Sequence, residues 1–250
     1  MHRILIDFGW FQLPAYGVML VAGFLLASSL LKREANRMGR DGQKMVDLAV
    51  VTLLIGLLGA KILLILVDLD DYLANPREIL GTIRAAGVLY GGIIAGSAGA
   101  IWYIKKHQLP VWDSIDIMAP FVALAIAFGR VGCLMAGCCY GQPYHGPFHL
   151  IFPENCDAPP GIPLFPTQPL SSLNALLLFG FLWWLLRRRR FEGQVALAFF
   201  ALYSLSRGMI EFLRGDEIRG IWFGVSTSQI IAACVFVTAA IFYFHRRKAS

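Results

Sequence analysis

The chain has 250 residues, of which 57% are hydrophobic and only 15% are charged, whereas soluble domains average about 45–50% apolar and 25% charged residues. This composition, with a mean hydropathy of +0.62, argues against a water-soluble globular protein and indicates a chain that folds in lipid. The net charge of +6 does not indicate a nucleic-acid partner, because the basic residues stand in short runs between apolar stretches, as membrane topology signals do.

The first apolar stretch follows an N-terminus without the basic region and small-residue cleavage site of a signal peptide, so we expect this helix to be retained. A membrane-spanning helix needs about 20 mostly apolar residues. Seven stretches fit, in chain order 12–31, 46–67, 85–104, 115–136, 169–187, 194–213 and 224–244. The sequence therefore predicts an all-α membrane protein with seven transmembrane helices, folded as one polytopic domain over residues 1–250.

The charges between these helices predict their orientation. Basic residues gather on one side, in segments 32–45, 105–107, 187–190 and the C-terminal His-Arg-Arg-Lys. On the other side, residues 68–84 are rich in acids and residues 137–168 hold no lysine or arginine. Because basic loops stay in the cytoplasm, we expect the N-terminus outside and the C-terminus in the cytoplasm. The proline- and glycine-rich segment 137–168 is then an irregular outer loop.

Charged residues inside the predicted helices cost roughly 2.5–3.5 kcal/mol each and therefore indicate a site. They are Lys61, Arg130, Arg207 and Glu211. At a rise of about 1.5 Å per residue, the three cations lie roughly 10 Å below the outer surface, and Tyr16 and Tyr90 reach the same level. Glu211 can neutralise Arg207 for insertion, but the cations remain in excess, and a phospholipid phosphate is the nearest anion.

The sixth predicted helix places its polar groups on one face, because Tyr203, Arg207, Glu211 and Arg214 are spaced by four, four and three residues. Glycines accompany the other polar groups. They allow either close helix packing or close approach of a ligand. We interpret Gly96 and Gly99 as packing positions, and Gly129 and Gly132, which flank Arg130, as part of a ligand site.

These residues resemble signature segments of the bacterial prolipoprotein diacylglyceryl transferases. Gly129-Arg130-Val131-Gly132 and the closing Gly141 resemble the family's Gly-Arg-x-Gly-Asn signature. Further similar segments follow in the family's order: Tyr16-Gly17, Tyr90-Gly91-Gly92, Pro166-Thr167-Gln168, Tyr203 to Arg214, and Ser228-Gln229. Three positions differ, because Tyr90 replaces a histidine, Cys133 an asparagine and Cys138 a glutamate.

The resemblance implies a transferase that moves diacylglyceryl from phosphatidylglycerol to the lipobox cysteine of a preprolipoprotein. It also implies a multi-pass protein of the bacterial inner membrane, with its active site toward the outer leaflet. Because a leaving phosphate needs cations, we assign the catalytic set Arg130, Arg207, Tyr90 and Glu211, in which Glu211 orients Arg207. We expect these substrate-binding residues: Tyr16, Lys61, Gly91, Gly92, Gly129, Gly132, Cys133, Cys138, Gly141, Tyr203 and Arg214. We expect no cofactor and no metal.

The five cysteines leave alternatives open. Cys234 is interpreted as an inert apolar residue, whereas Cys156 is a candidate for a disulfide with Cys138 or Cys139 in the outer compartment. A covalent lipid thioether on Cys133 or Cys138 is a further alternative. No zinc-binding spacing is recognised, although His145 and His149 lie nearby in the sequence.

Three other functions also remain open. The first is a phospholipid-using transferase with a different acceptor, and the second is a lipid or anion transporter. The third is a thiol-redox protein that uses the adjacent Cys138 and Cys139.

Overall fold

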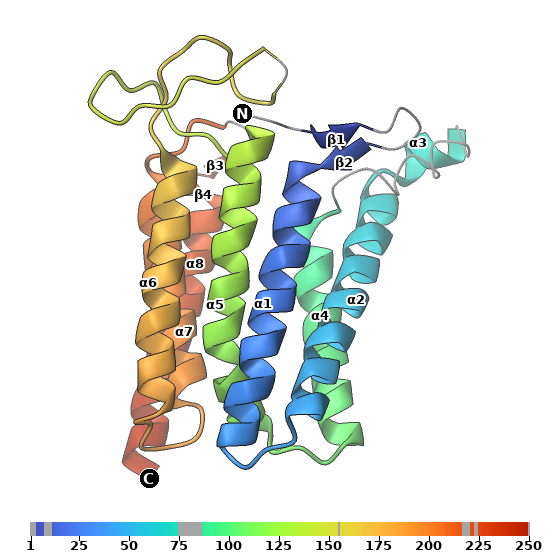
Figure 1. The fold of residues 1–250 in the computed structure, drawn as a ribbon, viewed down its shortest axis with the longest axis vertical. Coiled ribbons are helices and arrows are strands. Elements are labelled where there is room, and N and C mark those ends of the chain that lie inside the picture. Colours follow the sequence, from blue (N-terminus) through green and yellow to red (C-terminus); the bar gives the residue numbers. More distant parts are fainter. Residues whose placement is uncertain are drawn as a thin grey trace. The chain divides into compact units, whose positions relative to one another are not determined.

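The computed structural model describes residues 4–7, 12–74, 87–154, 156–216, 221–222 and 225–249 (Figure 1). The helices are α1 (Ala15–Arg37), α2 (Gly42–Val67), α3 (Leu69–Ala74), α4 (Leu89–Lys106), α5 (Val111–Ala136), α6 (Thr167–Leu186), α7 (Gln194–Glu211) and α8 (Thr227–Ala249). Strands β1 (Ile4–Asp7) and β2 (Gln12–Pro14) form one antiparallel pair, and β3 (Ile221–Trp222) and β4 (Val225–Ser226) form another.

Each of the seven predicted helices corresponds to one long helix, so the all-α prediction is confirmed. The six-residue α3 was not predicted, because it is too short to leave a periodic signal. Parts of the predicted helices 85–104 and 224–244, and of the acid-rich segment 68–84, lie outside the described residues. In the described part of the chain, α1, α2, α5, α6 and α8 are long and apolar enough to cross a membrane.

The helices α4 and α7 are not among these, because each has only 18 residues and includes polar or charged ones. Glycines and the terminal Lys105 and Lys106 reduce the hydropathy of α4, and Arg207 and Glu211 reduce that of α7. The count of seven spans and their orientation therefore stay predictions at this point.

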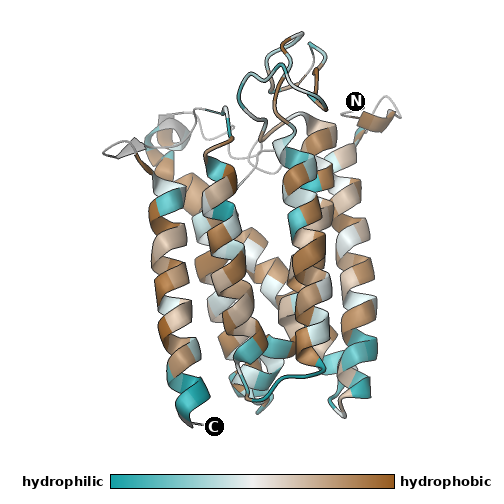
Figure 2. Ribbon diagram, turned by 90° about the vertical axis from the view of Figure 1, so that its left-hand side faces the viewer, coloured by the Kyte–Doolittle hydropathy of each residue, from teal (hydrophilic) through white to brown (hydrophobic). Residues whose placement is uncertain are grey.

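Much apolar surface remains exposed along the helices. Figure 2 shows hydrophobic colour over their middle parts and hydrophilic colour near several of their ends. Only 6% of the apolar stretch of α2 is buried inside the protein, and Ile94 and Leu177 are 70% and 66% exposed. Because soluble monomers rarely expose such continuous apolar surface, these helices are those of a multi-pass membrane protein.

The chain divides into two compact units, which are described separately. Unit 1 comprises Met1–Leu30 and Ile115–Ser250, and unit 2 comprises Leu31–Ser114. The prediction of a single domain over residues 1–250 is not tested by this division.

Unit 1 is held together by polar contacts between its helices as well as by apolar packing. Asp116 of α5 is fully buried and accepts hydrogen bonds from the backbone nitrogens of Gly193 and Ala196, both at 2.8 Å. Its carboxylate also pairs with Arg189 at 3.2 Å. Farther along α5, the carbonyl of Ala127 accepts the hydroxyl of Ser172 from α6 at 3.0 Å. Together these bonds fix α5 against α6 and against the start of α7.

Unit 2 is built on direct backbone packing of α2 against α4. A methyl group added at Gly59 would overlap Ala95, and one added at Gly91 would overlap the carbonyl of Gly59. One added at Gly96 would lie 3.2 Å from the carbonyl oxygen of Thr52. Glycines thus let the two helices approach closely, which confirms the packing interpretation of Gly96; Gly99, which faces the Ile55 side chain, serves the same purpose.

Candidate active site

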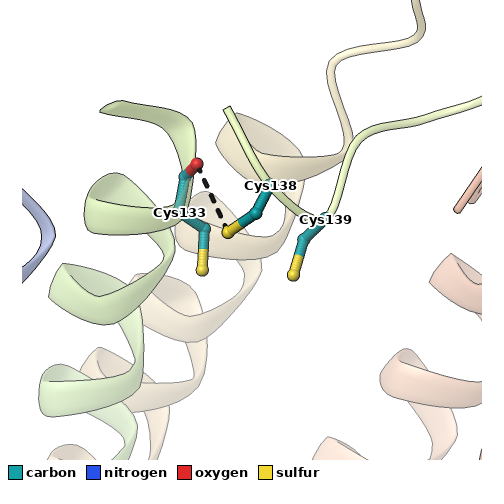
Figure 3. Close-up of side chains that lie close together, drawn as sticks. All are labelled: Cys133, Cys138 and Cys139. Atoms are coloured by element: carbon teal, nitrogen blue, oxygen red, sulfur yellow. Dashed lines mark hydrogen bonds between the residues drawn. The ribbon is translucent and has the colours of Figure 1, made fainter. Parts of the chain in front are cut away.

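The end of α5 turns back on itself and gathers three cysteines. Gly137 and Cys139 both adopt left-handed backbone angles, with φ of 74° and 61°. The nitrogen of Cys138 donates to the carbonyl of Cys133 at 3.1 Å, and the Cys138 thiol lies 3.8 Å from the same oxygen. As a result, the sulfur atoms of Cys133, Cys138 and Cys139 all lie within 4.8 Å of one another (Figure 3).

The start of α6 holds this turn in place. The hydroxyl of Thr167 donates to the carbonyl of Cys139, and the side-chain amide of Gln168 donates to the carbonyl of Cys138, each at 2.9 Å. Both donors are buried, with 1% of each residue exposed. The segment Pro166-Thr167-Gln168 therefore fixes the backbone of the two adjacent cysteines. Its resemblance to a family segment did not predict this role.

Gly141 connects the same loop to the end of α7. It forms a β-bridge with Arg214, flanked by hydrogen bonds from Gln142 to Leu213 at 3.0 Å and from Gly215 to Tyr140 at 3.1 Å. A side chain at Gly141 would overlap the carbonyl of Phe165. Glycine is therefore required here by backbone packing, which positions the Arg214 backbone beside the cysteine turn.

The polar face of α7 forms a network around Glu211, which is 8% exposed. Its carboxylate pairs with Arg207 and lies 3.9 Å from Nε of Arg214. It also accepts the hydroxyl of Ser226 at 3.2 Å. Arg214 in turn makes two hydrogen bonds to Asp216, at 2.8 and 2.5 Å. These contacts place Arg207, Glu211 and Arg214 on one face, as the spacing predicts, whereas an orienting role of Glu211 in the reaction stays a prediction.

Arg130 and Tyr16 complete the site within unit 1. The Arg130 guanidinium is close enough to Tyr203, Cys133 and Cys139 to interact with them electrostatically. Tyr16 of α1 lies over Gly132, where an added methyl group would come within 2.9 Å of the tyrosine ring. The small size of Gly132 thus has a packing reason, whereas at Gly129 an added methyl would only touch Leu20 at 3.5 Å.

The cysteine turn and the arginines influence each other's ionisation. Hydrogen bonds from Cys133 and Cys138, aided by the charges of Arg214 and Arg130, hold the pKa of the Cys139 thiol below its usual range. Hydrogen bonding to Cys133 and Cys139 raises the pKa of Cys138. Burial disfavours the charged form of Arg214, but hydrogen bonds to Asp216 and the charge of Cys139 outweigh burial and raise its pKa. The cysteine turn and Arg214 therefore interact electrostatically.

The structure brings most of the predicted site residues together in unit 1. They are Tyr16, Arg130, Gly132, Cys133, Cys138, Gly141, Tyr203, Arg207, Glu211 and Arg214. Lys61, Tyr90, Gly91 and Gly92 belong to unit 2, so their part in the site stays a prediction.

Five further residues of the site were not predicted as catalytic or substrate-binding: Cys139, Thr167, Gln168, Asp216 and Ser226. Thr167 and Gln168 stand in one of the family-like segments. For Asp216 a signal existed, namely an acid two residues after a predicted site arginine. For Cys139 the signal was its position next to Cys138.

The candidate disulfide of Cys156 does not form. All five cysteines are among the described residues, and each is free. The sulfur of Cys156 instead lies 3.1 Å from the carbonyl of Pro153, and its side chain packs where a Cβ on Gly137 would stand. Cys156 belongs to a small apolar cluster of the outer loop around Phe152 and Leu164. Cys156 therefore packs against Gly137 and this apolar cluster.

Comparison with known proteins shows the family of the chain. The family model described as "Prolipoprotein diacylglyceryl transferase" matches residues 3–245. The chain belongs to the prolipoprotein diacylglyceryl transferase family. It is 37% identical to the phosphatidylglycerol–prolipoprotein diacylglyceryl transferase of Clostridium tetani, over 98% of this chain and 97% of that protein.

Two other relatives also match over most of their length. The chain is 34% identical to phosphatidylglycerol–prolipoprotein diacylglyceryl transferase 2 of Clostridium perfringens, over 93% and 90% of the two chains. It is 28% identical to the enzyme of the same name from Oceanobacillus iheyensis, over 98% and 88%. The resemblance found in the signature segments is thereby confirmed along the full chain, and with it the assignment to a transferase family.

Proposed function

We propose that the chain transfers diacylglyceryl from phosphatidylglycerol to the lipobox cysteine of a preprolipoprotein. The observation that carries this proposal is the cluster of Arg130, Arg207 and Arg214 in unit 1. Two carboxylates, Glu211 and Asp216, accompany these three cations. One positive charge is left over, in helices whose surroundings are apolar. A phosphodiester anion matches this charge.

The arginines suit the leaving group of the reaction. The acceptor thiolate attacks a glycerol carbon, the carbon–oxygen bond breaks, and its electron pair leaves with the phosphate as glycerol phosphate. Negative charge therefore grows on the phosphate in the transition state, where preorganised donors are worth about 2.7–4 kcal/mol each. Arg207 meets this requirement because Glu211 already holds it, and Arg130 supplies a second cation near Arg207.

We also propose seven spans with the N-terminus outside, the C-terminus in the cytoplasm and the site toward the outer leaflet of the bacterial inner membrane. In unit 1 the site lies at the end of α5, whereas the arginine run follows α6 at the opposite helix end. In that run, Arg187 and Arg188 lie over the rings of Trp183 and Trp184, at 4.9 and 5.1 Å.

Such pairing of cations with tryptophan is typical of the membrane–water interface. Unit 2 repeats it with Lys106 over Trp102 at 4.8 Å. Together with the positive-inside rule, these contacts support a cytoplasmic position for the basic ends of both units.

A transfer assay tests the proposed activity. Purified protein is given phosphatidylglycerol labelled in its diacylglyceryl part, together with a lipobox peptide. We expect label on the peptide, and a loss of about 100- to 1,000-fold in kcat for Arg130→Ala and Arg207→Ala. Arg190→Ala is the matched control, because this exposed arginine lies at the other end of the helices.

Three results would contradict the proposal. Label that reaches only another acceptor would select a different phospholipid-using transferase. Lipid that crosses vesicles without turnover would select a transporter. If both arginine variants keep an activity within a few-fold of the wild type, the arginine cluster does not stabilise the leaving phosphate.

A further inference from the structure

The cysteines Cys133, Cys138 and Cys139 form a trithiol cluster, a name kept for these three residues. Their sulfur atoms lie within 4.8 Å of one another (Figure 3). A zinc–sulfur bond of about 2.3 Å at the tetrahedral angle places two zinc-bound sulfurs about 3.8 Å apart. The sulfurs therefore need to approach by about 1 Å or less to surround one zinc ion.

The backbone of the cluster is held independently of any metal. Thr167 and Gln168 bind the carbonyls of Cys139 and Cys138, and the turn between Cys133 and Cys138 is closed by a backbone hydrogen bond of 3.1 Å. Only the thiol groups remain to be adjusted by side-chain rotation. Preorganisation of this kind lowers the cost of binding an ion.

The electrostatic surroundings match a thiolate–zinc complex. Three thiolates carry three negative charges, of which a zinc ion neutralises two. Arg214 and Arg130 already interact with Cys139. Sulfur ligands select soft or borderline cations over magnesium and calcium, and zinc adds no redox chemistry. Cys138 and Cys139 are partly exposed, so the cluster is accessible from the loop side.

We propose that the trithiol cluster binds Zn²⁺ and that the open fourth position takes the acceptor cysteine as a thiolate. This proposal rests on the proposed transferase function, and it departs from the expectation of no metal drawn from sequence spacing. Three protein ligands and one exchangeable position are the usual arrangement of catalytic zinc sites, whereas structural sites have four protein ligands.

The step balances without an oxidant or reductant. The acceptor thiol binds the zinc ion and releases its proton to water. The zinc-bound sulfur then attacks the glycerol carbon, a carbon–sulfur bond forms, and the carbon–oxygen bond to the phosphate breaks. The electron pair leaves with the phosphate oxygen, which Arg130 and Arg207 stabilise. The thioether product is a weak ligand and leaves, and the zinc ion stays in the same oxidation state.

A zinc ion would activate the acceptor thiol. A free cysteine with a pKa near 8.5 is only about 3% thiolate at pH 7, whereas coordination to zinc deprotonates a thiol outright. The gain in thiolate is about 30-fold. The two carboxylates of the site do not serve as the base, because Glu211 is paired with Arg207 and Asp216 with Arg214.

The first test measures metal binding without reference to activity. The purified full chain is analysed for zinc, and then reloaded with Co²⁺ so that sulfur-to-cobalt charge transfer can be seen in the near ultraviolet. We expect one metal ion per chain, lost in the triple variant Cys133→Ser, Cys138→Ser, Cys139→Ser and kept in the control Cys234→Ser. Equal metal content in the triple variant and the wild type would overturn the proposal.

The second test asks whether the acceptor thiol reaches the metal. Adding a lipobox peptide should change the cobalt spectrum, whereas the same peptide with serine in place of the lipobox cysteine should not. An unchanged spectrum would mean a metal without the activating role, and would also overturn the proposal. Because this cobalt spectrum is measured on the wild-type chain, the result does not depend on the folding of the serine variants.

The transfer assay separates this proposal from the proposed function. Wild-type protein stripped of metal by a chelator should lose at least about tenfold in kcat/KM and recover when Zn²⁺ is returned. Full transfer by stripped protein would overturn the zinc proposal and leave the transferase function standing. No transfer by zinc-loaded wild-type protein to any lipobox peptide would mean that the transferase function itself is wrong, and the zinc proposal would fall with it.

Discussion

Replacing Glu211 by glutamine tests how the arginines are positioned. The carboxylate pairs with Arg207, lies 3.9 Å from Arg214 and accepts Ser226 at 3.2 Å. Glutamine keeps the shape but loses the charge, and hydrogen bonds to charged groups contribute about 1.5–3 kcal/mol. If that energy holds Arg207 in its productive position, Glu211→Gln lowers kcat/KM by about 13- to 160-fold.

The transfer assay with varied phosphatidylglycerol checks this expectation. The loss should fall mainly on kcat, because Arg207 acts on charge that develops in the transition state. Glu154→Gln is the matched control, since Glu154 is exposed on the outer loop. It should keep the wild-type rate.

A double-mutant comparison decides whether Glu211 works through Arg207. Once Arg207→Gln is in place, adding Glu211→Gln should cost little more, because the residue that Glu211 orients is already gone. A positioning role for Glu211 would be refuted if the loss in the double variant equalled the product of the two single losses. It would also be refuted if Glu211→Gln kept the wild-type rate.

Two further substitutions test the scaffold by thermal unfolding in detergent. Gly141→Ala should destabilise the protein by about 1–3 kcal/mol, because its methyl would overlap the carbonyl of Phe165. The control Gly180→Ala, whose methyl would meet nothing within 4 Å, should cause no loss of stability. Equal melting temperatures of the two variants would contradict the expectation for Gly141. Asp116→Ala leaves Arg189 and two backbone N–H groups without their buried partner and should cost about 3–5 kcal/mol, so an unchanged melting temperature would show that the tie between α5 and α7 is not needed.

The helices could be predicted from the sequence because lipid imposes a simple rule: about 20 apolar residues in a row. That rule found all seven long helices and missed the short α3. The contact between Arg207 and Glu211 was also predictable, because a spacing of four residues fixes neighbours on one helix face. Local periodicity is enough for such features.

The trithiol cluster could not be predicted in the same way. Cys133 lies on a helix and Cys138 and Cys139 beyond its end, so their approach depends on a turn through left-handed angles at Gly137 and Cys139. Asparagine and glycine favour such angles but cysteine does not, so a left-handed angle at Cys139 could not be expected from residue type. The anchors Thr167 and Gln168 follow nearly thirty residues later, and only the fold brings them to this turn.

A doubly labelled lipid gives the most direct test of the proposed reaction. Phosphatidylglycerol carries one label in its diacylglyceryl part and another in its head-group glycerol, and the purified chain is given a lipobox peptide. We expect the first label on the cysteine sulfur of the peptide and the second released as glycerol phosphate, in equal amounts. Phosphate carried onto the acceptor, or label transferred equally well to a peptide with serine in place of the lipobox cysteine, would contradict thiolate attack on the glycerol carbon.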